Sequence, residues 1–177
     1  MRIETIFAQQ LFAFVLPDGE EVSPLNELDR LLELWTDTEY LFQFAKDNLT
    51  GINIAKYVRE RQEDVEQIQD IIEKISKDET LKFETFFQPL HNEEYQVKSL
   101  SLQKAKTKHG HRRNELRLYA IKIDENCFVI TGGAIKLTQA VQEHPLTAVE
   151  FEKLKICRQF LKDNGVFDDN SLYEFIM

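Results

Sequence analysis

The stretch LRLYAIKIDENCFVIT, residues 116–131, contains two runs rich in β-branched and aromatic residues, separated by Asp-Glu-Asn. Runs of this kind on either side of a short polar turn are typical of an antiparallel β-hairpin. Gly132 and Gly133 interrupt the second run, which predicts a bulge or a close approach by another backbone segment. This hairpin is the strongest structural signal in the sequence.

Further strands and several helices are predicted around the hairpin. Apolar residues in alternation predict strands over residues 2–7, 11–16, 97–105 and 127–137. Apolar residues three and four positions apart predict helices that begin at Ser23-Pro24, at 36–39, at 53 and at 147, with a short one from about 171.

These elements predict an α+β fold, with an antiparallel sheet of four or five strands and helices packed mainly on one face. We expect the N-terminal strands to join the sheet of residues 97–137, so that residues 1–177 form a single domain. Residues 1–80 supply strands and helices, and residues 86–162 supply the main sheet and the last long helix. The polar segment 77–84 is the one candidate boundary, and it is short and poor in Gly and Pro.

Length and composition exclude several classes of protein. The 177 residues are 42% apolar and 30% charged, with four prolines and six glycines, so disordered, collagen-like and linker-like chains are excluded. No uncharged apolar run reaches the ~18 residues of a membrane helix. The N-terminus lacks the features of a signal peptide, and Cys127 and Cys157 fit neither a disulfide framework nor a zinc site. We therefore expect a reduced, cytoplasmic protein.

The charges are distributed unevenly along the chain. The net charge is −9, which on average disfavours nucleic acid. Residues 98–122 nevertheless contain eight Lys or Arg against one acid, Glu115, which gives this segment a charge of +7. The rest of the chain has 14 basic and 30 acidic residues and a charge of −16. Segregation of this kind predicts two different surfaces.

The basic stretch KAKTKHGHRR, residues 104–113, is the clearest functional feature. A cluster of this kind can neutralise several phosphates of a nucleic acid. It can equally bind an acidic protein segment, including the acid-rich helix of this same chain, or be a hairpin tip kept solvated by its charges. The nucleic-acid hypothesis assigns phosphate contacts to Lys104, Lys106, Lys108, Arg112 and Arg113.

His109 and His111 lie within this stretch and can face one side of an extended chain. A zinc site needs three or four ligands, and no acid or cysteine stands nearby at ligand spacing, so no metal site is expected. The chain also contains no G-x-G-x-x-G, phosphate-cradling loop, G-x-S-x-G or H-E-x-x-H motif. We therefore expect no cofactor, and most standard enzyme classes lose support.

Three residues of the hairpin region carry a catalytic hypothesis. Arg117 and Tyr119 share one parity and, across the predicted turn, would face Gly133 and Thr131. Lys136 follows shortly after. An Arg, a Tyr and a Lys on a sheet surface can stabilise a phosphorane-like transition state and move a proton without a metal. The alternative is structural: Tyr119 packs a half-buried face and Arg117 extends its charge to the surface.

A series of short motifs runs along residues 86–162. They are Pro89-Leu90, Leu116-Arg117-Leu-Tyr119, Asp124-Glu-Asn126, Phe128-Val-Ile130, Ile135-Lys136-Leu-Thr138-Gln139, His144-Pro145 and Glu150-x-x-Lys153. Their order resembles the RelE/ParE toxin superfamily, and more closely its HigB-like, phage-derived branch. The N-terminal half has at least one helix more than those compact toxins.

The resemblance implies a type II toxin of a toxin–antitoxin system, a metal-independent endoribonuclease that cuts mRNA, usually on the ribosome, and is silenced by an antitoxin protein. It implies catalytic roles for Arg117 and Lys136, with Tyr119, Lys104 and Lys106 as weaker companions. The chain differs from such toxins in being acidic and long and in lacking a basic or His-bearing C-terminal tail. A non-catalytic protein of the same fold, which binds nucleic acid or an acidic partner through residues 104–113, is the alternative.

Overall fold

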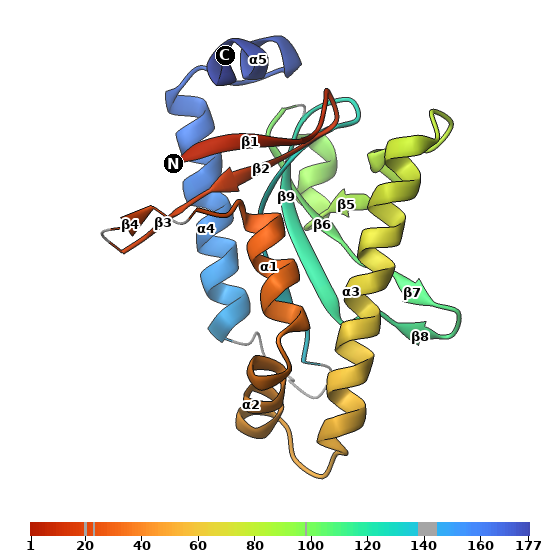
Figure 1. The fold of residues 1–177 in the computed structure, drawn as a ribbon. Helices are drawn as coiled ribbons and strands as arrows, with labels where there is room; N and C mark the ends of the chain where they lie inside the picture. Colours follow the sequence, from red (N-terminus) through yellow and green to blue (C-terminus); the bar gives the residue numbers. More distant parts are fainter. Residues whose placement is uncertain (20, 23, 98, 138–144) are drawn as a thin grey trace.

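The computed structural model describes the chain except residues 20, 23, 98 and 138–144 (Figure 1). Its main sheet has six strands in the order β1-β2-β10-β9-β6-β5. These strands are β1 (Arg2–Phe7), β2 (Leu11–Val15), β5 (Phe87–Pro89), β6 (Ser101–Ala105), β9 (Leu116–Asp124) and β10 (Cys127–Ile135). Two short ribbons accompany it, β3 (Pro17–Asp18) with β4 (Glu21–Val22) and β7 (Lys108–His109) with β8 (Arg112–Arg113).

The sheet is mixed, so the prediction of an antiparallel sheet of four or five strands is wrong. The predicted hairpin is present as β9 and β10, and the N-terminal strands join the sheet as predicted. However, β2 pairs with β10 in parallel, with Phe128 opposite Leu11. The chain between these two strands includes three helices, and a connection of that length does not impose the antiparallel direction that a hairpin turn imposes. The sixth strand, β5, has only three residues, too few for a periodic pattern.

In the part of the chain that the structure describes, five α-helices accompany the sheet. They are α1 (Glu27–Thr36), α2 (Thr38–Asn48), α3 (Ile54–Lys77), α4 (Pro145–Asp163) and α5 (Asp169–Ile176). The first begins later than predicted, because Asn26 caps it by accepting a hydrogen bond from the backbone N–H of Asp29 at 3.0 Å. Asp37 caps α2 in the same way, because its side chain accepts a hydrogen bond from the backbone N–H of Tyr40 at 3.0 Å, and α2 begins within the predicted 36–39.

The helices cover both faces of the sheet, so the prediction that they pack mainly on one face is also wrong (Figure 1). Helices α1–α3 pack on the face that carries Leu11 and Ala13, and α4 and α5 pack on the face that carries Phe12 and Phe14. The physical reason is that β2, β9 and β10 are apolar on both sides, which requires cover on both sides.

The predicted bulge and the predicted close approach both occur at the glycine pair. The pairing of β10 with β9 shifts by one residue between Ile130 and Gly132. A Cβ on Gly133 would lie 2.4 Å from the carbonyl oxygen of Arg117 and 2.8 Å from the ring of Trp35. Only glycine therefore lets α1 and β9 come this close to β10.

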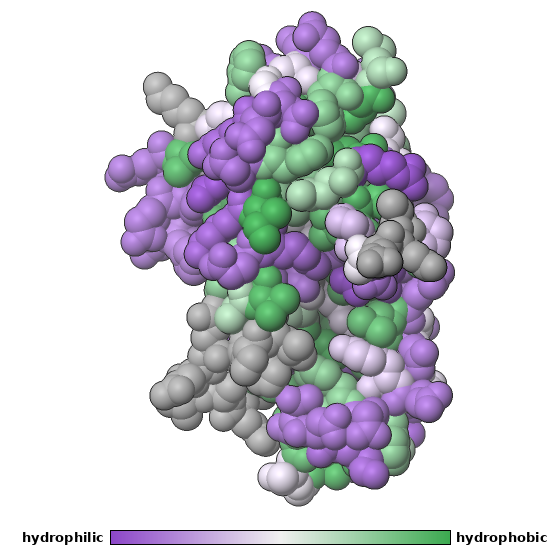
Figure 2. Space-filling view, turned by 90° about the vertical axis from the view of Figure 1, so that its left-hand side faces the viewer, coloured by the Kyte–Doolittle hydropathy of each residue, from purple (hydrophilic) through white to green (hydrophobic). Residues whose placement is uncertain are grey.

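The side of the molecule that is on the left in Figure 1 is turned towards the viewer in Figure 2, which shows hydrophobic residues interspersed with hydrophilic ones. On α4, Val149 and Ile156 are exposed, two turns apart on the helix.

Within the described ranges, no helix combines the length and the apolar character needed to cross a membrane.

Candidate functional site

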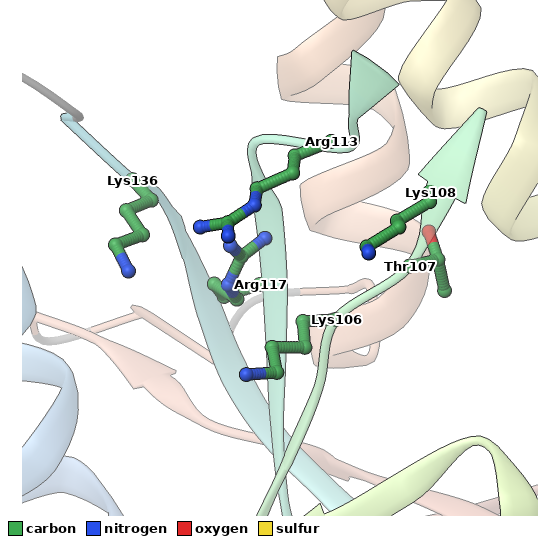
Figure 3. A pocket seen from close by; sticks show the side chains of 6 residues that line it. All are labelled: Lys106, Thr107, Lys108, Arg113, Arg117 and Lys136. Carbon is green, nitrogen blue, oxygen red and sulfur yellow. The ribbon is translucent and has the colours of Figure 1, made fainter. Parts of the chain in front are cut away.

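Five cationic side chains surround one cavity at the end of the central strands (Figure 3). The cavity has a volume of about 290 Å³, and it is lined by Lys106, Thr107, Lys108, Arg113, Arg117 and Lys136. We call it the cationic cavity. Its lining contains no carboxylate among the described residues, and none of the five cations forms an ion pair within the ranges that the structure describes.

Four segments of the chain bring these cations together. Arg117 lies on β9 opposite Ala134 of β10, and Lys136 follows directly after β10, where its backbone N–H donates to the carbonyl of Glu115 at 2.7 Å. Lys106 follows the end of β6. Lys108 and Arg113 form a cross-strand pair of the β7–β8 ribbon. In Figure 3 the charged ends of Arg113, Arg117 and Lys136 point towards one another across the cavity.

Arg117 is the most firmly held of the five. Its side chain is largely buried, and one guanidinium nitrogen, Nη1, donates to the carbonyl oxygens of Asn114 at 2.5 Å and Leu116 at 3.0 Å. Two backbone oxygens therefore fix the guanidinium in place, and among the described residues no hydrogen-bond partner occupies its other N–H groups, which can donate to an anion.

The cations oppose one another electrostatically. Burial lowers the pKa of Lys136, and repulsion by Arg117, Lys106 and Arg113 lowers it further. The pKa of Lys104, beside the cavity, is lowered in the same way by burial and then by Lys106, Lys136 and Arg117. Burial also lowers the pKa of Arg117. An anion in the cavity would relieve this repulsion, so the electrostatics of the cavity favour an anionic ligand.

The basic stretch 104–113 is divided between the cavity and the protein's own acidic helix. On the β7–β8 ribbon, Lys108 and Arg113 face the cavity, whereas their neighbours His109 and Arg112 face α3. Arg112 Nη1 lies 2.9 Å from Asp64 Oδ1, and His109 Nε2 lies 3.3 Å from the same oxygen. The charge of Arg112 is therefore paired inside the protein and does not line the cavity, so this geometry does not favour its assignment to phosphate contacts, which stays a prediction.

The docking of the ribbon on α3 rests on a buried polar network that sequence reasoning missed. Asp64 is fully buried, and its Oδ2 accepts hydrogen bonds from Arg61 Nε at 2.9 Å and from the backbone N–H of Glu115 at 3.1 Å. Arg61 also donates from Nη1 to Glu115 Oε2 at 2.7 Å. The ribbon gains further contacts from Gln67, which donates to the carbonyl of Lys108 and accepts from Thr107 Oγ1 at 2.6 Å.

Tyr119 does not belong to the cationic cavity, so its predicted catalytic role is not supported by its position. The side chain is only 4% exposed and packs edge-on against Phe151 of α4, with ring centroids 5.4 Å apart. Across the bulge it pairs with Gly132 rather than Thr131, and Arg117 pairs with Ala134 rather than Gly133. This packing agrees with the structural alternative for Tyr119, and its catalytic role stays a prediction.

Burial raises the pKa of both cysteine thiols, Cys127 and Cys157, to about 12, so they are unreactive core residues. Within the ranges that the structure describes, no group of three or more His, Cys, Asp or Glu residues has the arrangement of a metal site.

The cavity can bind a phosphate group of a nucleic acid. Arginine matches two phosphate oxygens at once, lysine adds point charges, and a lowered pKa makes a lysine a better proton acceptor at a given pH because more of it is neutral. Comparison with known proteins adds no assignment: no family model, no curated protein and no solved structure matches the chain. The function has to be inferred from the cavity.

Proposed function

We propose that the protein binds single-stranded RNA at the cationic cavity and cleaves it there without a metal ion, as a toxin of the RelE/ParE kind. The observation that carries the proposal is the convergence of five cations on one cavity of about 290 Å³ with no described carboxylate in its lining. Such an arrangement has an electrostatic cost that an anionic ligand in the cavity would offset, which supports a binding function for it.

RNA supplies its own nucleophile for this reaction. The 2′-hydroxyl oxygen bonds to the adjacent phosphorus while the bond from phosphorus to the 5′-oxygen breaks, which leaves a 2′,3′-cyclic phosphate and a free 5′-hydroxyl. A neutral lysine takes the proton of the 2′-hydroxyl, and a protonated lysine gives one to the leaving 5′-oxygen. Arg117 and Arg113 stabilise the charge that develops on the phosphate oxygens.

The lysines suited to proton transfer are those whose pKa is lowered. Lys136 lines the cavity, and Lys104 lies beside it, and burial together with neighbouring cations lowers the pKa of both. Each therefore has a larger neutral fraction near pH 7 than an ordinary lysine has. Protonated Lys and Arg side chains carry no lone pair for a metal and repel a metal cation, which favours a reaction run by side chains alone.

The acidic remainder of the chain bears on how the RNA is presented. Its charge of −16 repels a long polyanion, so the free protein is expected to bind RNA weakly outside the cavity. Presentation of the mRNA by a ribosome would remove that difficulty, and a protein antitoxin would silence the toxin by covering the cavity. The ribosome and the antitoxin protein are therefore the partners that we propose.

A second candidate is RNA binding without cleavage. The observation that favours it is the absence of an aromatic hydroxyl, imidazole or carboxylate from the cavity lining among the described residues, with Tyr119 buried against Phe151 instead. On this hypothesis the cavity holds a phosphate and no proton is transferred.

Expression of the protein alone in bacteria, followed by primer extension on cellular mRNA, tests the proposal. We expect growth arrest with new mRNA ends that carry a free 5′-hydroxyl, and we expect Lys136→Ala or Arg113→Ala to restore growth. Lys82→Ala, an exposed lysine of the polar connector, is the matched control and should stay toxic. RNA binding by the purified protein without new mRNA ends in the cells would favour the second candidate. If neither the purified wild type nor any variant binds RNA, both candidate functions are refuted.

A further inference from the structure

A second cavity adjoins the cationic cavity. It has a volume of about 270 Å³, and it shares Lys106 and Thr107 with the first. The rest of its lining comes from the last part of α3 and the segment before β5, and it consists of Ile71, Lys74, Ile75, Leu81, Thr85 and Phe86. We call it the apolar cavity, because most of its wall surface is apolar, although lysine and threonine residues also line it.

The shared wall between the cavities is held in place. Thr107 Oγ1 donates to Gln67 Oε1 of α3 at 2.6 Å, and Asn114 Nδ2 donates to the same oxygen at 2.9 Å. Phe86 is held on its other side, because its ring packs edge-on against Phe87 at a centroid distance of 4.9 Å. Both cavities therefore exist before any ligand binds, at a fixed distance from each other.

The two linings differ in charge and polarity, as the phosphate and the base of a nucleotide do. The cationic cavity suits a phosphate, and the apolar cavity offers a phenyl ring, aliphatic side chains and the hydroxyl groups of Thr85 and Thr107. Its volume lies at or below the lower end of the roughly 300–1,000 Å³ typical of sites for drug-sized ligands, so it suits one small ring system rather than a large cofactor.

We propose that the apolar cavity receives the base of a nucleotide that flanks the phosphate held in the cationic cavity. This inference rests on the proposed function. Proteins that bind single-stranded nucleic acid combine a cationic track for the backbone with aromatic and apolar surfaces for the bases. Here Lys106 belongs to both cavities, so one side chain can contact the phosphate while its aliphatic part lines the site of the base.

Binding of short single-stranded RNAs that differ by one missing base tests the inference. The probes are a fluorescently labelled oligoribonucleotide and a series of the same oligomer with one abasic position at a time, measured by anisotropy. We expect one abasic position to weaken binding to the wild type by about fivefold or more, since stacking of one base is worth roughly 1–3 kcal/mol. The salt dependence should not change, because the phosphates are intact.

Leu81→Ala tests whether the affinity lost with the abasic RNA comes from contacts in the apolar cavity. Leu81 lines the apolar cavity and is 41% exposed, so its truncation spares the core. We expect it to weaken binding of the intact RNA about threefold and to have no effect on the abasic RNA that already lost affinity. Ile156→Ala, which truncates an exposed apolar residue of α4 outside both linings, is the control and should bind as the wild type does.

The outcomes separate this inference from the proposed function. Equal binding of the intact RNA and every abasic RNA by the wild type overturns the base site and leaves the phosphate site standing. A Leu81→Ala effect of the same size on intact and abasic RNA also overturns it. No binding of any RNA by the wild type overturns both proposals.

Discussion

Removal of one cation from the cationic cavity should reduce the salt dependence of RNA binding by a fixed step. Each phosphate that a cation neutralises on a single strand contributes about −0.7 to the slope of log affinity against log salt concentration. The five cations of the cavity therefore give a slope of about −3.5 when all of them contact phosphate. Arg113→Ala should bring the slope to about −2.8 and weaken binding at every salt concentration.

Arg112→Ala is the matched control, because it removes a neighbouring arginine of the same ribbon whose charge is already paired. Arg112 lies 2.9 Å from Asp64 and 3.5 Å from Glu63, so it should contribute nothing to the slope. Fluorescence anisotropy with a labelled single-stranded RNA, at several salt concentrations between about 50 and 200 mM, measures the slope for each protein. If Arg112→Ala reduces the slope as much as Arg113→Ala does, or if neither changes it, the division of the basic stretch is refuted.

Three further predictions concern pH and stability. Binding of an anion requires Lys104 and Lys136 protonated, and their pKa values in the free protein are lowered. RNA affinity should therefore begin to fall at a lower pH than it would with ordinary lysines; anisotropy at constant salt across a pH series measures this. Lys136→Gln should raise the free energy of unfolding by about 0.5 kcal/mol, a small gain because the side chain is exposed, while Lys82→Gln should not; urea denaturation compares them. Gly133→Ala should lower the free energy of unfolding by about 1–3 kcal/mol or more, because the added Cβ would lie 2.4 Å from the backbone oxygen of Arg117. An unchanged midpoint of urea denaturation would contradict this.

The β9–β10 hairpin and the pairing of Arg117 with the region of Lys136 could be predicted because both depend on short-range patterns. Alternation defines the two strands, and the short turn between them sets which residues face each other. The exact partners could not be predicted, because an extra residue at Thr131 shifts the register by one, and sequence alternation does not say on which side of the glycine pair a bulge forms.

Local patterns could not predict the direction of β2, because it depends on segments far apart in the chain. Docking of the basic stretch on the acid-rich helix was one of the alternatives for residues 104–113, but local patterns could not select it over the others. One signal of the docking is nevertheless visible. The apolar stripe of the long helix is broken by a polar stretch that contains Arg61 and Asp64, three residues apart on one helix face. A charged pair within the buried stripe of a helix indicates that another charged segment packs there, and the basic ribbon is that segment.

The buried acid of α3 and the exposed cations of the cavity form one arrangement. In a two-stranded ribbon, opposite residues share a face and the next pair takes the other face, so Lys108 with Arg113 and His109 with Arg112 face opposite ways. Asp64 holds the second pair, and this leaves the first pair in the cavity beside Arg117 and Lys136. The five cations of the cavity repel one another, which opposes their assembly. The attraction between Asp64 and the side of the ribbon that carries His109 and Arg112 offsets part of this repulsion. An acidic chain can in this way present a strongly cationic cavity, because part of its acid is placed where it positions the cations without neutralising those that face the ligand.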